Sequence, residues 1–183
     1  MVVAYFDSLG FERSYDCEIR RRLPPNGYPH YAIPPADAAT EGLLVSWRVG
    51  GREFIANFEP HDFPLNAVFA TPRADTALVV AGGCGYFFRP EAADADACPI
   101  LPVNQIAARA ESNVLVAASF TDLIGMVDGD QSWVARDLVT DELTILSLES
   151  DAIRVKGWSG PRNRQVDLIL DPTSGVVVAT EVP

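Results

Sequence analysis

The sequence predicts an all-β protein, an antiparallel meander of short strands, and three observations lead to this fold class. Short apolar runs such as Val114–Ala118 and Leu123–Val127 are typical of strands buried on both faces. Turn residues such as Gly50-Gly51 separate the runs about every 8 to 12 residues. Leu78 and Leu115 occupy similar stretches 37 positions apart, which indicates that one type of β-meander unit occurs more than once in the chain. This spacing is near a four-stranded propeller blade, and a sandwich or a strongly curved partial barrel fits it as well.

The N-terminal third is expected to contain one strand, one arm and one hairpin. Apolar and charged residues alternate over Phe11–Arg20, apart from Arg13, which predicts a half-buried strand. The proline-rich stretch Leu23–Pro35 predicts an extended arm that packs over a sheet edge, with a partner-binding or pocket-lining loop as the alternative. One helical turn is expected in Pro35–Glu41. Leu44–Phe58 is the clearest hairpin, closed by the two glycines already named.

The rest of the chain predicts a meander of further strands. We expect these strands at Ala67–Ala70, Ala77–Ala81, Tyr86–Arg89, Val114–Ala118, Leu123–Val127, around Trp133, and at Glu142–Leu148, Ile153–Trp158, Gln165–Leu170 and Val176–Val182. Pro90–Pro99 is expected to be a long acidic loop. Val103–Arg109 is ambiguous, since its alanines favour a helix and its spacing favours a strand. Residues 1–183 are interpreted as a single domain, with a weak seam near residues 60–66 as the candidate boundary.

Composition places the chain among soluble cytoplasmic proteins. Hydrophobic residues make up 48% and charged residues 21%, which is ordinary for a globular domain. No apolar run approaches the roughly 18 residues that a membrane helix needs. The N-terminus has no basic segment of the kind that opens a secretion signal. The three cysteines, Cys17, Cys84 and Cys98, are odd in number and widely spaced, so we expect reduced thiols, and neither a disulfide framework nor a cysteine zinc site.

The formal charge of −11 narrows the classes of partner. Such a surface repels phosphate backbones, which disfavours nucleic-acid binding. It attracts a basic partner and speeds the encounter at low salt. The plain alternative is that the charge only keeps the protein soluble.

Nucleophile motifs give one residue of interest. The chain has no Gly-x-Ser-x-Gly elbow. Cys84 stands between glycines that let a backbone approach closely, and either His30 or His61 could serve as its base. A buried, inert cysteine at a hairpin corner is the more common outcome, and we favour it.

Metal and anion motifs are equally weak. Glu59 with His61-Asp62 could form a loop site, and the alternating Asp94, Asp96 and Cys98 could bind calcium, but neither has a complete ligand set. Asp128-Gly129-Asp130 is better interpreted as a turn. Arg20-Arg21-Arg22 could form an anion site, since guanidinium groups suit carboxylates and phosphates, but on so acidic a chain it is expected to pair with neighbouring acids. No catalytic, cofactor-binding or metal-binding residue and no cofactor is therefore predicted.

Part of the chain resembles a known group of proteins. The residues concerned are Phe120-Thr121-Asp122-Leu123, Trp133, Ile153 with Gly157-Trp158, Val166-Asp167-Leu168, and Thr173-Ser174-Gly175-Val176. They resemble the C-terminal half of a family of small, uncharacterised bacterial β-proteins with propeller-blade-like meanders. The resemblance covers roughly residues 77–180. It implies a bacterial β-meander and no chemistry.

These observations favour a non-enzymatic, acidic intracellular protein-binding module, of the kind that inhibits a basic toxin as an immunity protein does. Its expected partner is a basic protein, and its oligomeric state is left open. The rival hypothesis is a small-ligand binder or hydrolase with a pocket near Tyr28–Tyr31, His61 and Cys84. A deep pocket containing polar groups with shifted pKa values would favour the rival.

Overall fold

The computed structural model describes residues 4–22, 29–35, 42–128 and 131–181, and within them it is all-β, as predicted. Contacts divide the chain into two compact units, unit 1 (Met1–Cys98) and unit 2 (Pro99–Pro183). The single-domain interpretation of residues 1–183, with its seam near residues 60–66, stays a prediction. No helix in the described ranges is long and apolar enough to span a membrane.

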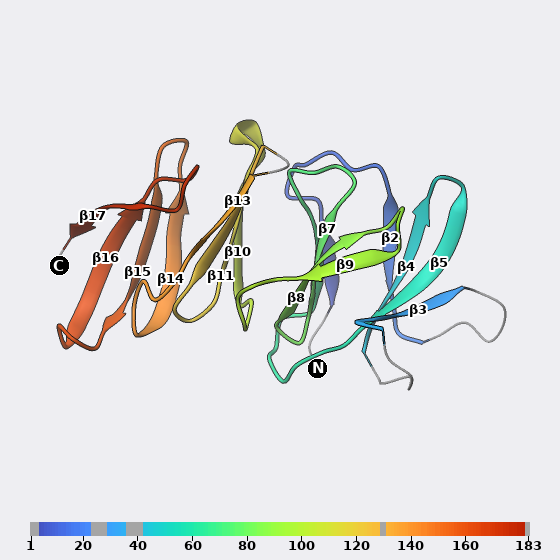
Figure 1. Ribbon diagram of the computed structural model, residues 1–183, viewed down its shortest axis with the longest axis horizontal. Helices are drawn as coiled ribbons and strands as arrows, with labels where there is room; N and C mark the ends of the chain where they lie inside the picture. Colours follow the sequence, from blue (N-terminus) through green and yellow to red (C-terminus); the bar gives the residue numbers. More distant parts are fainter. Residues whose placement is uncertain (1–3, 23–28, 36–41, 129–130, 182–183) are drawn as a thin grey trace. The chain divides into compact units, whose positions relative to one another are not determined.

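Unit 1 contains two sheets (Figure 1). Its strands are β1 (Tyr5–Asp7), β2 (Asp16–Arg20), β3 (His30–Ile33), β4 (Leu43–Val49), β5 (Arg52–Phe58), β6 (Ala67–Ala70), β7 (Ala77–Ala81), β8 (Cys84–Arg89) and β9 (Asp94–Ala97). One sheet has the order β2-β4-β5-β3 and the other β1-β6-β7-β8-β9. The strands β6 to β9 form a continuous antiparallel meander, and β1 joins it in parallel with β6.

The β4–β5 hairpin supplies the aromatic centre of unit 1. Gly50 and Gly51 have φ values of 56° and 76°, so they form the two-residue turn that the sequence predicts. Trp47 is fully buried on β4. Its ring centroid lies 4.8 Å from that of Phe88 on β8, and Phe58 on β5 lies 5.2 Å from the same ring. Residues of both sheets therefore pack in one apolar core.

Unit 2 consists of two four-stranded antiparallel meanders (Figure 1). Sheet C contains β10 (Gln105–Arg109), β11 (Val114–Ala118), β12 (Leu123–Val127) and β13 (Gln131–Ala135), with a short 3-10 helix, η1 (Ala110–Ser112), between β10 and β11. Sheet D contains β14 (Asp141–Leu148), β15 (Ile153–Ser159), β16 (Arg164–Leu170) and β17 (Val177–Glu181). Alternate residues of β11, β12, β15 and β16 face one core between the two sheets.

The internal repeat predicted by the 37-residue spacing is visible in these meanders. Leu78 lies on β7, the second strand of the meander β6 to β9, and Leu115 lies on β11, the second strand of sheet C. Every residue of both strands is buried. Among the described residues no sheet closes into a barrel.

The prediction of a long acidic loop at Pro90–Pro99 is wrong, because this stretch contains the strand β9. This strand pairs with β8 from Tyr86↔Ala97 to Arg89↔Asp94. Its alternation of aspartate and alanine carries no large apolar residue, and such residues are the signal that identifies a strand in a sequence. The ambiguous stretch Val103–Arg109 contains a strand, β10, and no helix.

Two N-terminal predictions also need correction. The strand predicted over Phe11–Arg20 is limited to β2, because residues 11–15 have other hydrogen bonds. The amide of Phe11 closes a turn by donating to the carbonyl of Ser8, and the amide of Ser14 donates to the distant carbonyl of Ala74. The arm predicted to cover a sheet edge supplies that edge itself, since β3 pairs in parallel with β5. Residues 23–28 of the arm, and residues 36–41 of the helical turn expected in Pro35–Glu41, lie outside the described residues.

Candidate functional site

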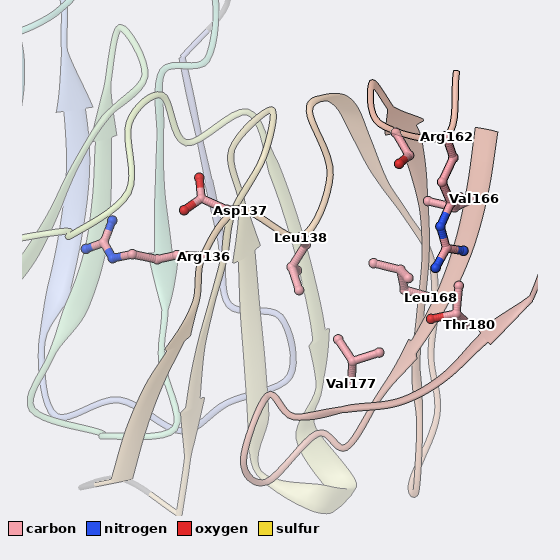
Figure 2. Close-up of a pocket in the computed structure, with 9 residues that line it drawn as sticks. Arg136, Asp137, Leu138, Arg162, Val166, Leu168, Val177 and Thr180 are labelled. Atoms are coloured by element: carbon pink, nitrogen blue, oxygen red, sulfur yellow. The ribbon is translucent and has the colours of Figure 1, made fainter. Parts of the chain in front are cut away.

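A cavity of about 300 Å³ opens in unit 2 between the segment after β13 and sheet D. Figure 2 shows its lining. The lining residues are Arg136, Asp137, Leu138, Ser159, Arg162, Val166, Leu168, Val177 and Thr180. They come from three separate parts of the chain, and none of them was singled out as a site residue from the sequence.

The floor of the cavity is apolar because of the alternation along β16. Val166 and Leu168 point into the core between the two sheets and are 3% and 6% exposed. On β17, Thr180 pairs with Leu168, and Val177 with Leu170, so both lie over the same face of sheet D. In Figure 2 the side chain of Leu138 points across the cavity toward this floor.

The segment that carries Leu138 is held by hydrogen bonds to the β11–β12 turn. The amide of Leu138 donates to the carbonyl of Thr121 at 3.0 Å, and the amide of Asp137 donates to Asp122 Oδ1 at 2.8 Å. The side chain of Arg136 donates to the carbonyl of Pro99 at 3.3 Å. This wall of the cavity is thus fixed by three hydrogen bonds, one between main-chain groups and two that involve a side chain.

Two arginines lie at the rim of the cavity and differ in their partners. Arg136 lies 4.0 Å from the carboxylate of Asp122, and in Figure 2 its side chain extends away from the floor. Arg162 belongs to the β15–β16 turn, which is closed by the amide of Asn163 donating to the carbonyl of Gly160. Its guanidinium reaches toward Leu168 and Thr180 in the same view, and it forms no ion pair with another residue of the described chain. The cavity therefore combines an apolar floor with a cation that has no ion-pair partner in the part of the chain that the structure describes.

The predicted corner at Cys84 and the loop of His61 lie next to each other in unit 1. A Cβ on Gly82 would overlap the carbonyl oxygen of His61, so a glycine is required for this close approach. The hydroxyl of Tyr86 donates to the carbonyl of Glu59 at 2.8 Å. Burial raises the pKa of the Cys84 thiol, which disfavours the thiolate that a nucleophile requires.

The predicted arm lines a different cavity. His30, Tyr31, Ala32, Ile33, Pro35 and Ala93 enclose about 260 Å³ beside β3. Neither His61 nor Cys84 belongs to this lining set, so the three parts of the predicted pocket do not share this cavity. Tyr28 lies outside the described residues.

The acids of the candidate calcium site are occupied by an arginine. Arg89 on β8 contacts Asp94 and Asp96 on β9 at 2.6 Å each. The hydrogen bond from Arg89 lowers the pKa of Asp94. Across the described ranges no group of three histidine, cysteine or acidic side chains could hold a metal ion.

The remaining candidate residues from the sequence make contacts with their neighbours in the chain. At the candidate loop site, His61 Nδ1 accepts a hydrogen bond from the amide of Asp62 at 2.9 Å. Arg20 pairs with Glu18 at 2.9 Å, which confirms the expected pairing with a neighbouring acid for this one member of the Arg20-Arg21-Arg22 run. Asp128 lies in a turn with a φ of 46°, and Asp130 is outside the described residues.

Comparison with protein-family models, with curated proteins and with solved structures gives no match to this chain. The resemblance to a bacterial β-protein family therefore stays a prediction.

Proposed function

We propose that this protein is a non-catalytic binding module whose partner is a basic protein. The observation that supports this function is the gathering of carboxylates in the turns at one end of unit 2. A basic surface that meets this end would be attracted before contact, because the whole chain carries a formal charge of −11.

The strand pairing places these turns together. At one end of the unit, the amide of Leu143 at the start of β14 donates to the carbonyl of Phe120 in the β11–β12 turn. The β10–β11, β12–β13, β14–β15 and β16–β17 turns therefore lie at the opposite end, where Figure 1 shows η1 and the upper turns of sheet D. The described acids of these turns are Glu111, Asp128, Glu149, Asp151 and Asp171.

Few cations offset this acidic end. Arg109 lies 3.9 Å from Glu111, and Arg154 lies 3.4 Å from Glu149. The other described acids of the end have no ion pair with another described residue. Hydrogen bonds from Thr173 lower the pKa of Asp171, so this carboxylate stays charged at neutral pH.

The shifted acids of the molecule favour binding over catalysis. Asp75 accepts hydrogen bonds from Arg73 and Thr76, and the pKa of Asp75 is lowered. Asp94 bonds to Arg89, and Asp171 caps a turn. Each of these carboxylates has a structural partner that accounts for its shift, whereas a catalytic acid would have its pKa raised toward the working pH.

The test compares two variants that remove the same charge from different places. One variant carries Glu111→Gln, Asp128→Asn, Glu149→Gln and Asp151→Asn. The control carries Glu12→Gln, Glu59→Gln, Asp62→Asn and Glu91→Gln on exposed positions of unit 1. Each protein captures partners from a lysate at low salt, a salt step elutes them, and the dissociation constant of an identified partner is measured by calorimetry.

We expect a basic protein that the wild type and the control retain and the acidic-end variant loses. Equal loss of the captured protein in both variants would show that binding depends only on the net charge of the chain. That result would contradict the acidic end as the binding surface. Capture of no basic protein by the wild type would contradict the proposed function.

A further inference from the structure

We propose that the cavity of unit 2 binds a small amphipathic monocarboxylate, with Arg162 holding the carboxylate and the floor of sheet D holding the apolar body. This inference is separate from the proposed function, because the cavity lies at the Phe120–Thr121 end of unit 2, opposite the acidic turns.

The floor provides the apolar half of the site. Val166 and Leu168 are almost completely buried, Val177 is 39% exposed, and Leu138 closes the opposite wall. An exposed valine beside a hollow leaves apolar surface in water, and an apolar ligand would cover it. Burial of such surface is favourable in proportion to its area, so the floor can hold a hydrocarbon body without a polar contact.

Arg162 provides the charged half of the site. Its guanidinium reaches over the floor toward Thr180 (Figure 2), and it has no ion-pair partner among the described residues. A guanidinium presents parallel N–H donors that match the two oxygens of a carboxylate. Ser159 and Thr180 line the same cavity, and a hydroxyl group is able to donate a further hydrogen bond to a carboxylate.

The charge of the surroundings disfavours ligands that carry several negative charges. Unit 2 carries twelve acids and six bases, so a polyphosphate would meet a repulsive field. A cationic ligand would meet the guanidinium of Arg162, which reaches over the floor, whereas Arg136 extends away from the floor and lies beside Asp122. The volume of about 300 Å³ is at the lower end of the range for ligand cavities, which suits a small molecule.

The carboxylate could belong to a free acid or to the C-terminus of a peptide, and two probes distinguish these sources. Octanoate, below its micellar concentration, represents the free acid, and N-acetyl-leucyl-valine represents the peptide. Octan-1-ol has the same apolar body as octanoate without the charge. Each probe is titrated into the full chain, and the methyl resonances of Leu138, Val166, Leu168 and Val177 are followed by NMR.

Two matched variants test the charged contact. Arg162→Gln removes the proposed ligand of the carboxylate. Arg164→Gln removes the same charge from an exposed residue two positions along that does not line the cavity. Both side chains lie on the surface, so neither substitution is expected to unfold the protein.

We expect saturable shifts of the floor methyls with octanoate or with the peptide acid, and weaker shifts with octan-1-ol. Arg162→Gln should raise the dissociation constant about tenfold, in line with the loss of a charged hydrogen bond, while Arg164→Gln leaves it unchanged. Any one of three results would overturn the proposal: no saturable shift with either acid, equal binding of octan-1-ol, or equal affinities of the two variants.

Discussion

The indole Nε1 of Trp133 donates a hydrogen bond of 2.9 Å to the carbonyl of Pro172. Trp133 lies on β13 in sheet C, and Pro172 lies in the turn between β16 and β17 in sheet D. The ring also lies directly against Gly125 and Gly175, where any Cβ would overlap it. One side chain thus joins the two sheets of unit 2 by a hydrogen bond and by close packing.

Gly125→Ala is expected to destabilise unit 2, because the new methyl group would occupy the space of the Trp133 ring. Overpacking of this kind lowers the free energy of unfolding by about 1 to 3 kcal/mol. Urea denaturation followed by circular dichroism measures the change.

A double-mutant cycle with Trp133→Leu isolates the cause. Leucine lacks the indole atoms that the methyl would meet, so Gly125→Ala should lower the free energy of unfolding less in that background than in the wild type. The same loss in both backgrounds would mean that the ring does not set the requirement for glycine.

Asp171 is expected to make stability fall in acid. Its Oδ1 accepts hydrogen bonds from the hydroxyl and amide of Thr173, at 2.6 and 2.7 Å, and from the amide of Ser174 at 3.0 Å. The bonds from Thr173 lower the pKa of Asp171 in the folded protein. Its stabilising contribution is therefore complete above the unfolded pKa, near 3.9, and is lost as the pH falls through the lower, folded pKa.

With Asp171→Asn, the free energy of unfolding should fall less steeply as the pH is lowered below about pH 4. The control Asp151→Asn removes the same charge from the neighbouring β14–β15 turn, and thermal unfolding across the pH range compares both. The same loss of stability in acid for the wild type and for Asp171→Asn would contradict the role of the Asp171 carboxylate in capping this turn.

Gln105→Leu should lower the free energy of unfolding by about 1 to 3 kcal/mol. In the side chain of Gln105, Nε2 donates to the carbonyl of Leu143 at 2.9 Å and Oε1 accepts from the main-chain amide of Ile145 at 3.0 Å. These bonds satisfy the carbonyl of Leu143 and the amide of Ile145, which lie where the pairing of β14 shifts its register. A leucine side chain could bond to neither of these main-chain groups.

The same substitution at Gln165 is the control, because that side chain donates to the exposed carboxylate of Glu142. We expect the urea midpoint to fall more for Gln105→Leu than for Gln165→Leu at an unchanged m-value. The reverse order would show that the contact between β10 and β14 contributes little to stability.

Cys17 should react slowly with a thiol reagent in the folded protein. Burial raises the pKa of Cys17 to about 11, so at pH 8 its thiolate fraction is roughly one hundred times lower than that of an ordinary cysteine. A variant with Cys84→Ser and Cys98→Ser leaves this thiol alone, and its labelling rate is compared with and without denaturing urea. Equal rates in the two conditions would contradict the shift.

The hairpin β4–β5 and the strands β11 and β12 could be predicted because their signals are local. A period of two, a pair of glycines and continuous apolar runs lie within one short segment, and they act through the backbone of that segment alone. The acidic strand β9 lacked such a signal, since its pairing depends on the neighbouring β8 and on Arg89, which contacts both of its aspartates.

The sequence by itself determined the all-β class, most of the strands and the acidic charge, because each follows from neighbouring residues or from a sum over the chain. Only the tertiary structure decided that His30–Ile33 would pair in parallel with β5 and that Arg162 and Leu138 would line one cavity. Such groups are far apart along the chain. They meet only when sheets pack and twist, and no local pattern records that meeting.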